Sequence, residues 1–296
     1  MKPSKTLYVS DMDGTLLNSS SVLSETTTAK LNKLISEGAL FTVATARTPA
    51  TVVGLMKNID SNLPYIVMAG CATWDNKKKR YESARIISNS SIERLIGIFE
   101  KNGNNPFIYY KNGNQIVVNH VRELTAEEKE FIEPRIKTPL KRLKTCSSLT
   151  VDATLEGAML IFSMGKFEAL RNIADEIDKE GIDCTYNCYH DIFKKDEGFI
   201  DIYVNGTTKA AAIKELARKI GAERIVVFGD NLNDIPMMKV ADWSVAVSNA
   251  FDEVKEYANE ITESNDEDAV VRWIEMDIEN NSMQRKNKQH SIVYMP

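Results

Sequence analysis

The chain is poor in the residues that build crosslinks and thiolate or imidazole metal sites, with three histidines and four cysteines among its 296 residues. Cys71 and Cys146 stand alone, while Cys184 and Cys188 lie four apart in "CTYNC", which suits neither a zinc knuckle nor a thioredoxin-type pair. Residues four apart share one face of a strand, so we expect this pair to act as small apolar side chains. The sequence therefore disfavours a zinc or disulfide framework.

Long apolar runs and an excess of positive charge are also missing. No run reaches membrane-spanning length, and the first residues, "MKPSKTLYVSDMDG", lack the apolar stretch of a signal peptide. The formal net charge is −5, whereas a nucleic-acid-binding protein normally carries a basic face. We expect a cytoplasmic protein that binds neither membrane nor nucleic acid, and nothing in the sequence indicates its oligomeric state.

What is present is ordinary globular composition, 43% hydrophobic and 27% charged, at a length that allows one large domain or two moderate ones. "TLYVS", "ALFTVAT" and "PYIVMAG" have the pattern of strands, and helices are predicted after the cap Ser24 and from Pro49. The same rhythm returns with "GFIDIYV", "RIVVFGD" and "WSVAV". Alternating strands and helices predict a parallel sheet covered on both faces.

The middle of the chain has a different pattern. "TWDNKKKRYES" is typical of a hairpin, and alternating strands such as "QIVVN" favour an antiparallel sheet. We predict an α/β fold in which residues 1–83 and 191–296 form a doubly wound parallel-sheet core and residues 84–190 an inserted α+β domain. Beyond about residue 277 the polar, aperiodic sequence predicts a loosely docked tail.

Polar residues follow the strands of the predicted parallel sheet, and ligands of open α/β sheets bind outside the carboxyl ends of the strands. Asp11 and Asp13 follow the first strand, and on an extended chain their side chains would point the same way. One carboxylate can attack phosphorus, while a second can protonate the leaving oxygen and then activate water. The alternative is an ordinary Asp turn before Gly14.

Two further segments carry residues suited to phosphate. Thr45 and Arg47 precede a helix start, whose free N–H groups favour anions, although a simple cap and a surface ion pair are open alternatives. Lys209 lies in the first turn of a predicted helix, where it opposes the helix dipole. Neutralising a phosphate would explain that position, and a solvated lysine is the alternative.

The segment "VVFGDNLNDIPMM" supplies carboxylates after another apolar strand. Asp230 together with Asp11 would offer the oxygen ligands that Mg²⁺ prefers. Asn233 and Asp234 are also natural helix caps before Pro236, and a cap can still be a ligand.

In this order, the four segments resemble the four motifs of the haloacid dehalogenase superfamily. With the inserted segment and "SVAVSNA", they are similar to its Cof-type branch, mostly Mg²⁺-dependent phosphatases of small phosphorylated metabolites. The resemblance implies a Rossmann-like core with an α/β cap domain. It implies that Asp11 is the nucleophile and a metal ligand, and that Asp13 is the general acid/base, with its carbonyl on the metal. It further implies phosphate contacts from Thr45, Lys209 and Asn233, and metal contacts from Asp230 and Asp234.

The aspartate at position 13 distinguishes branches of that superfamily, because it is absent from the branches that displace halide and also from the ion pumps. The resemblance thus predicts a phosphatase acting on a small phosphorylated metabolite, such as a sugar phosphate, through an aspartyl-phosphate. A phosphomutase and a non-catalytic metabolite-binding module are the alternatives. Ala46 stands where the family usually has glycine, and Ala69 where it usually has asparagine. Neither change removes a catalytic group. In the inserted domain, the candidate substrate contacts are Arg122, Asn187, Tyr189 and His190. Outside it, Arg47 is a further candidate.

Overall fold

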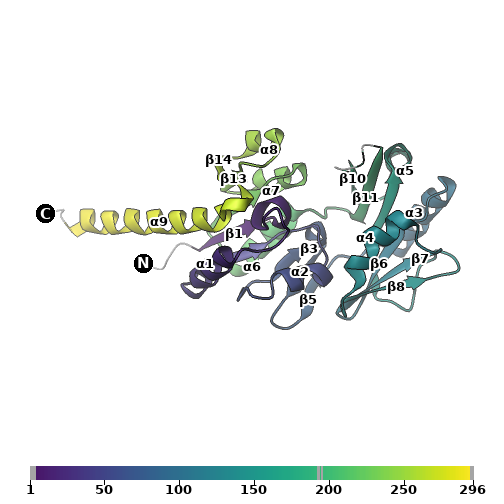
Figure 1. Cartoon of the computed structure of the whole chain (residues 1–296), viewed down its shortest axis with the longest axis horizontal. Helices are drawn as coiled ribbons and strands as arrows, with labels where there is room; N and C mark the ends of the chain where they lie inside the picture. The colour runs from purple at the N-terminus through teal and green to yellow at the C-terminus, as the bar shows by residue number, and fades with distance from the viewer. Residues whose placement is uncertain (1–4, 192–193, 195, 294–296) are drawn as a thin grey trace. The chain divides into compact units, whose positions relative to one another are not determined.

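The structure, a computed structural model, describes residues 5–191, 194 and 196–293 and forms two compact units, whose elements are labelled in Figure 1. The first unit comprises the described residues of Met1–Thr45, Leu55–Tyr65 and Ala212–Pro296. The second comprises Ala46–Gly54 and the described residues of Ile66–Ala211. No helix among the described residues is both long and apolar enough to span a membrane.

The first unit is built on a five-stranded sheet in the order β14-β13-β12-β1-β2, with every neighbouring pair parallel. Its strands are β1 (Thr6–Ser10), β2 (Leu40–Val43), β12 (Arg224–Gly229), β13 (Trp243–Val247) and β14 (Glu260–Thr262). The interior strand β1 is buried along its whole length, and Leu7, Val9 and Phe228 of the neighbouring β12 are completely buried. The uninterrupted apolar runs in the sequence correspond to strands covered on both faces.

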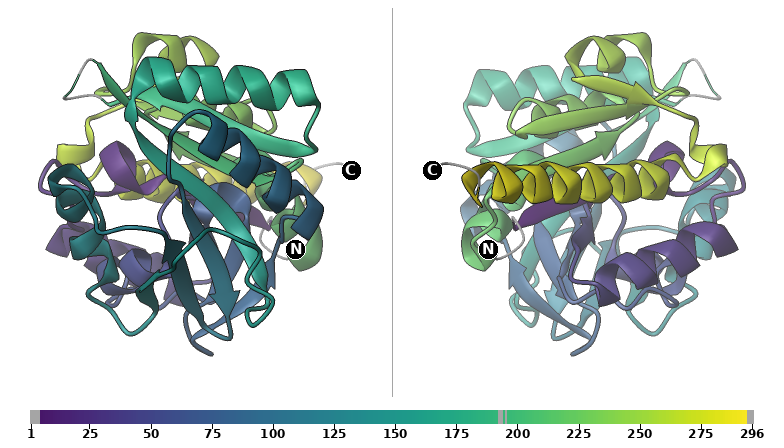
Figure 2. Two further views of the ribbon diagram at one scale, coloured as in Figure 1. Left: turned by 90° about the vertical axis from the view of Figure 1, so that its right-hand side faces the viewer. Right: turned by 90° about the vertical axis from the view of Figure 1, so that its left-hand side faces the viewer.

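Helices flank this sheet. The elements are α1 (Glu25–Ser36), α6 (Lys209–Ile220), α7 (Ile235–Met238), α8 (Asp252–Tyr257) and α9 (Ala269–Val293). The predicted cap is present, because the Ser24 side chain accepts a hydrogen bond from the Thr27 N–H at 2.8 Å. Figure 2 (right) shows α9 running across the strands of this unit beside α1. The helix continues to Val293, beyond the point where the sequence predicted an irregular tail.

The long helix α9 is fastened to the sheet through Asp277. Its Oδ2 accepts a hydrogen bond from the Tyr8 hydroxyl on β1 at 2.7 Å and pairs with Arg224 Nη1 on β12 at 2.6 Å. Burial, followed by the hydrogen bond to Asp277, raises the pKa of Tyr8. One carboxylate thus ties α9 to two neighbouring strands.

The second unit contains a six-stranded sheet in the order β10-β11-β9-β6-β7-β8. Its strands are β6 (Phe107–Asn112), β7 (Gln115–His120), β8 (Lys141–Thr145), β9 (Gly157–Lys166), β10 (Cys184–His190) and β11 (Glu197–Val204). All pairs are antiparallel except β7 with β8. The segment "GFIDIYV" was expected in the parallel sheet, whereas it forms β11 between β10 and β9.

The two faces of this sheet differ. Helices α3 (Asn89–Lys101) and α5 (Phe167–Glu180) lie across one face, as Figure 2 (left) shows, above a core that includes Ile108, Ile161 and Ile200. Cys184 and Cys188 pack against this core, in agreement with the prediction of apolar filling. The opposite face carries aromatic side chains and receives Phe131 of α4 (Ala126–Ile136), a helix that the sequence analysis did not predict.

A three-stranded sheet, β3 (Tyr65–Val67), β4 (Ala72–Asp75) and β5 (Arg80–Ala84), precedes α3. The predicted hairpin is present as β4 and β5. The expectation for "PYIVMAG" was wrong in one respect, since β3 pairs with this hairpin and not with the parallel sheet. Helix α2 (Pro49–Leu55) follows β2 in the chain.

Candidate active site

Three carboxylates meet at the carboxyl edge of the parallel sheet. Ser10 pairs with Phe228 across β1 and β12, so Asp11 and Asp230 emerge from adjacent strand ends. Asp11 donates its N–H to the Phe228 carbonyl at 2.9 Å. Asp11, Asp230 and Asp234 each offer an oxygen, and these oxygens lie within 4.8 Å of one another. Asp11 and Asp234 are buried and Asp230 is partly buried, so the structure gathers three of the predicted residues in a sheltered place.

The loop after β1 shapes this cluster. Residues 12–16 form a wide turn in which Leu17 N–H donates to the Met12 carbonyl at 2.8 Å, and Gly14 has φ 75°. A Cβ at Gly14 would clash with Asp230 Oδ2, so the turn needs glycine for both its backbone angle and its close approach. The chain is not an extended strand here, contrary to the assumption behind the predicted pairing of Asp11 with Asp13. Asp13 is exposed and its carboxylate is outside the cluster.

The loop after β12 holds the other two carboxylates. Asp234 Oδ2 accepts hydrogen bonds from the N–H groups of Asp230 and Asn231, each at 3.1 Å. A Cβ at Gly229 would collide with the Asp234 side chain, so this loop also depends on a close backbone approach. Asp234 therefore both supports the loop and lies in the cluster. Asn233 is exposed in the same loop.

Two contributors were not predicted. Thr15 donates its hydroxyl to Asp230 Oδ1 at 2.6 Å and so orients that carboxylate. Asn249 donates to the Gly14 carbonyl at 2.8 Å and accepts from the Asn265 N–H at 2.9 Å. The available signals were a hydroxyl directly after "DG" and an asparagine two residues after the strand "WSVAV".

The remaining predicted residues lie on separate elements. Thr45 is buried two residues beyond the end of β2, and the N–H of the preceding Ala44 donates to the Ser10 carbonyl at 2.9 Å. Arg47 and Lys209 belong to the second unit. Lys209 is buried at the first residue of α6, and the Arg47 carbonyl accepts from the Met68 N–H at 2.9 Å.

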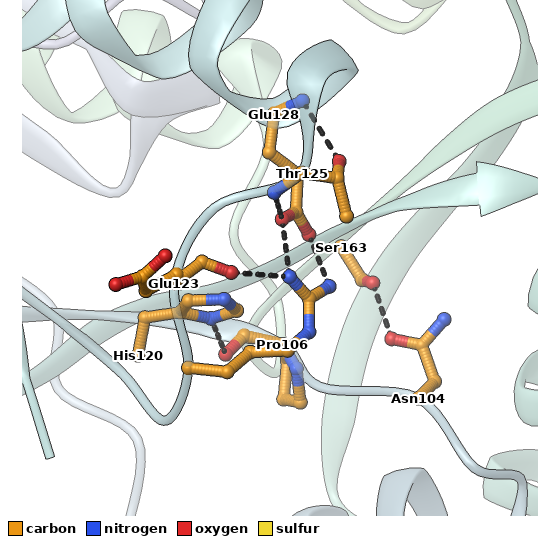
Figure 3. Close-up of polar contacts among 8 residues, drawn as sticks. Asn104, Pro106, His120, Glu123, Thr125, Glu128 and Ser163 are labelled. Atoms are coloured by element: carbon orange, nitrogen blue, oxygen red, sulfur yellow. Dashed lines mark hydrogen bonds and ion pairs between the residues drawn. The ribbon is translucent and has the colours of Figure 1, made fainter.

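Among the substrate-contact candidates of the second unit, Arg122 has a structural partner. Its guanidinium binds both carboxylate oxygens of Glu128, at 2.7 and 2.8 Å, and donates to the Glu123 carbonyl at 2.8 Å. Figure 3 shows Glu128 also closing the capping box with Thr125 that starts α4. Arg122 thus fixes the start of a helix, and Glu128 neutralises its charge.

The polar residues around this cap are also held in place. His120 is fully buried, its Nδ1 lies 3.3 Å from the Pro106 carbonyl, and burial lowers its pKa (Figure 3).

The other substrate-contact candidates of the second unit lie on β10. His190 stacks on Phe167 with ring centroids 3.5 Å apart, and the Tyr189 hydroxyl donates to Asp201 at 3.0 Å. Asn187 is exposed on β10.

Residues 8–274 match the sequence profile of the haloacid dehalogenase-like hydrolases. The chain belongs to this family. The predicted family and the fold class, a parallel-sheet core with an additional sheet domain, are therefore confirmed, as is the expectation of a hydrolytic enzyme.

Known relatives cover almost the whole chain. Two 5-amino-6-(5-phospho-D-ribitylamino)uracil phosphatases of Bacillus subtilis are 24% and 26% identical over 270 and 295 residues, covering 90% of this chain and 94% and 95% of theirs. A haloacid dehalogenase-like hydrolase from Bacteroides thetaiotaomicron superposes with a TM-score of 0.72 at 22% identity, covering 92% of this chain and 99% of its own. These matches agree with the fold described above.

The carboxylate cluster fits a hard divalent cation. Asp11, Asp230 and Asp234 supply oxygen donors alone, and no histidine or cysteine of the described residues joins them. Mg²⁺ favours such donor sets and retains coordination positions for water and a substrate phosphate. The donor chemistry supports the predicted cofactor class.

Proposed function

We propose that the chain is a Mg²⁺-dependent phosphatase that hydrolyses a small phosphorylated metabolite through an aspartyl-phosphate on Asp11. The observation that carries this proposal is the approach of Asp11, Asp230 and Asp234 to within 4.8 Å at the carboxyl edge of the parallel sheet. Bound there, Mg²⁺ would neutralise the carboxylates and the charge on the transferring phosphoryl group. The phosphatase names of the relatives give further support.

Different residues of the cluster and its loops have different roles in the proposed reaction. Asp11, at the end of the rigid strand β1, is the nucleophile, because its backbone N–H is anchored to β12 while its side chain emerges at the sheet edge. Asp13 is exposed two residues later, where it can exchange protons with the leaving oxygen and with water. Asp230, oriented by Thr15, and Asp234 hold the metal.

We further propose phosphate contacts for Thr45, Lys209 and Asn233, and a substrate contact for Arg47. Thr45 follows the strand next to β1, and Asn233 is exposed in the loop that carries Asp230 and Asp234. Lys209 is a buried lysine at a helix start, where the macrodipole disfavours a cation unless an anion compensates it.

A screen of phosphorylated metabolites for phosphate release tests the proposal. We expect inorganic phosphate to be released with Mg²⁺ and release to stop when the metal is chelated. Asp11→Asn should lower kcat by about a thousandfold or more, because no covalent intermediate can form. Asp175→Asn, at an exposed aspartate of α5, is the control and should leave the rate unchanged.

Circular dichroism of Asp11→Asn would confirm that the fold is retained. A rate near that of the wild type in this variant would exclude Asp11 as the nucleophile. Recovery of an isomeric phosphate ester in place of inorganic phosphate would exclude hydrolysis and identify a phosphomutase.

A further inference from the structure

Three consecutive residues between β3 and β4 have backbone angles of the left-handed region. Met68, Ala69 and Gly70 have φ of 52°, 54° and 94°. Glycine adopts such angles at little cost, whereas a residue with a Cβ does not, so the backbone is strained at Met68 and Ala69. The other described non-glycine residues with positive φ occur singly. Strain of this kind persists only where the surrounding structure imposes it, and it clusters at functional sites.

The Met68–Gly70 turn is held by hydrogen bonds on either side. The Met68 N–H donates to the Arg47 carbonyl at 2.9 Å, and the Cys71 N–H donates to the Met68 carbonyl at 2.9 Å. Cys71 is buried, and its own carbonyl accepts from the Arg85 N–H at 2.9 Å. The turn therefore cannot relax without breaking bonds to two other segments of the chain, one of which carries Arg47.

Gly70 packs against the start of α6. A Cβ at this position would collide with the Thr208 carbonyl and would lie 3.1 Å from the backbone nitrogen of Lys209. Thr208 caps α6, because its hydroxyl accepts from the Ala211 N–H at 3.0 Å. The turn thus contacts the residue that begins the helix, directly before the buried Lys209.

We propose that the Met68–Gly70 turn is a positioning element, which fixes Arg47 and Lys209 relative to one another for contact with the substrate. The inference rests on the proposed function, which gives these two residues contacts with substrate and phosphate. The turn, Arg47 and Lys209 all belong to the second unit, and the turn bonds to Arg47 on one side and packs on the residue before Lys209 on the other. A rigid turn with both contacts keeps two cationic residues at a set separation, as preorganised binding of a phosphate requires.

Gly70→Ala tests the contact with α6, using release of phosphate from p-nitrophenyl phosphate in the presence of Mg²⁺. The new Cβ displaces Thr208 and with it Lys209, so we expect kcat/KM to fall about tenfold or more. Gly103→Ala is the control, because Gly103 lies in the same unit and also has positive φ, but open space surrounds it. That variant should change kcat/KM by less than about twofold.

A double-mutant cycle shows whether the turn acts through Lys209. Lys209→Met should lower kcat/KM by itself, and adding Gly70→Ala should then lower it by less than about threefold more, because the group that the turn positions is already gone. Two losses that simply multiply would mean that Gly70 supports the fold alone, and would overturn the inference.

Ala69→Gly removes strain without adding an atom. Glycine tolerates the left-handed angle, so we expect the midpoint of urea denaturation to rise, while kcat/KM falls about threefold because a freer turn holds the two residues less firmly. Ala153→Gly, at an exposed alanine without positive φ, is the control and should not raise the midpoint. A more stable Ala69→Gly protein with unchanged turnover would show that the strain has no part in the reaction.

Binding of inorganic phosphate to the full chain with Mg²⁺, measured by calorimetry, separates this inference from the proposed function. If the wild type hydrolyses no phosphate ester, the proposed function fails, but phosphate binding that Gly70→Ala weakens about tenfold and Gly103→Ala does not would still support the inference. Hydrolysis that Gly70→Ala leaves unchanged would overturn the inference alone. A wild type that neither hydrolyses esters nor binds phosphate would overturn both. Circular dichroism checks each fold, and if Gly70→Ala does not fold, the result for Ala69→Gly decides.

Discussion

At the residue scale, the three carboxylates of the cluster repel one another, and nearby hydrogen-bond donors hold two of them in place. Asp11, Asp230 and Asp234 lie within 4.8 Å, so their charges oppose one another unless something compensates. Thr15 donates to Asp230, and two backbone N–H groups donate to Asp234. These bonds fix the directions of the oxygens, and a divalent cation bound to them would add positive charge to the cluster.

Gly14→Ala tests how closely that geometry is set. The new Cβ would clash with Asp230 Oδ2 at a backbone angle that alanine rarely adopts, so we expect turnover to fall at least tenfold, and more Mg²⁺ to be needed for half-maximal rate. Gly38→Ala is the matched control, since Gly38 also has positive φ but open space around it. Equal losses in both variants would attribute the effect to backbone strain and not to Asp230.

The sequence predicted the residues at strand ends better than the contacts between loops. Asp11, Asp230 and Asp234 could be found because polar residues after buried strands stand out from the pattern. Thr15 and Asn249 were missed because their roles depend on partners 215 and 235 residues away. The orientation of Asp13 could not be predicted either, since it depends on the turn over residues 12–16.

At the element scale, strands were easier to predict than their partners. "GFIDIYV" is apolar enough to be buried in either sheet, and only long-range pairing decides that it becomes β11. Helix α4 was missed because it buries only Glu128 and Ile132 and so has little periodicity. Its capping box, Thr125 with Glu128, was the signal that could have shown it.

Asp277→Ala tests the attachment of α9 to the sheet. The change leaves the Tyr8 hydroxyl and the Arg224 guanidinium without their partly buried acceptor, so we expect the free energy of unfolding to fall by about 1–3 kcal/mol. Urea denaturation measures the loss. Glu279→Ala, at an exposed residue of the same helix, should change stability by less than about 0.5 kcal/mol. A similar effect from both would mean that Asp277 adds nothing specific.

At the scale of the whole molecule, the chain contains two units, each with its own sheet and core, and the second holds a lysine at some cost to its stability. Burial of Lys141 on β8, of which 4% is exposed, lowers the pKa of its amine to about 7 from the ordinary value of 10.5. The folded state therefore binds fewer protons than the unfolded state between these values, so this residue lowers stability most below pH 7 and least above pH 10.5.

Lys141→Met should stabilise the protein, because it keeps the apolar stem and removes the buried amine. We expect a gain on the order of 3 kcal/mol at pH 7 that shrinks by pH 9, measured by urea denaturation at both values. Lys144→Met is the control, because the Lys144 amine is partly exposed and already paired with Asp152 at 2.6 Å, so its removal should not stabilise the protein. A loss of stability in Lys141→Met would show that the amine has a favourable partner in the folded protein.

The hydrogen bonds that join Asn249 to Gly14 and Asn265 to Asn249 have a consequence for how this protein can diverge. They fasten together three separate loops beside the carboxylates, so adding a single amino acid to any of them would shift Asp11, Asp230 and Asp234 relative to one another. Insertions and deletions should therefore accumulate elsewhere, as in the basic turn between β4 and β5, while these three loops keep constant length across evolutionary time.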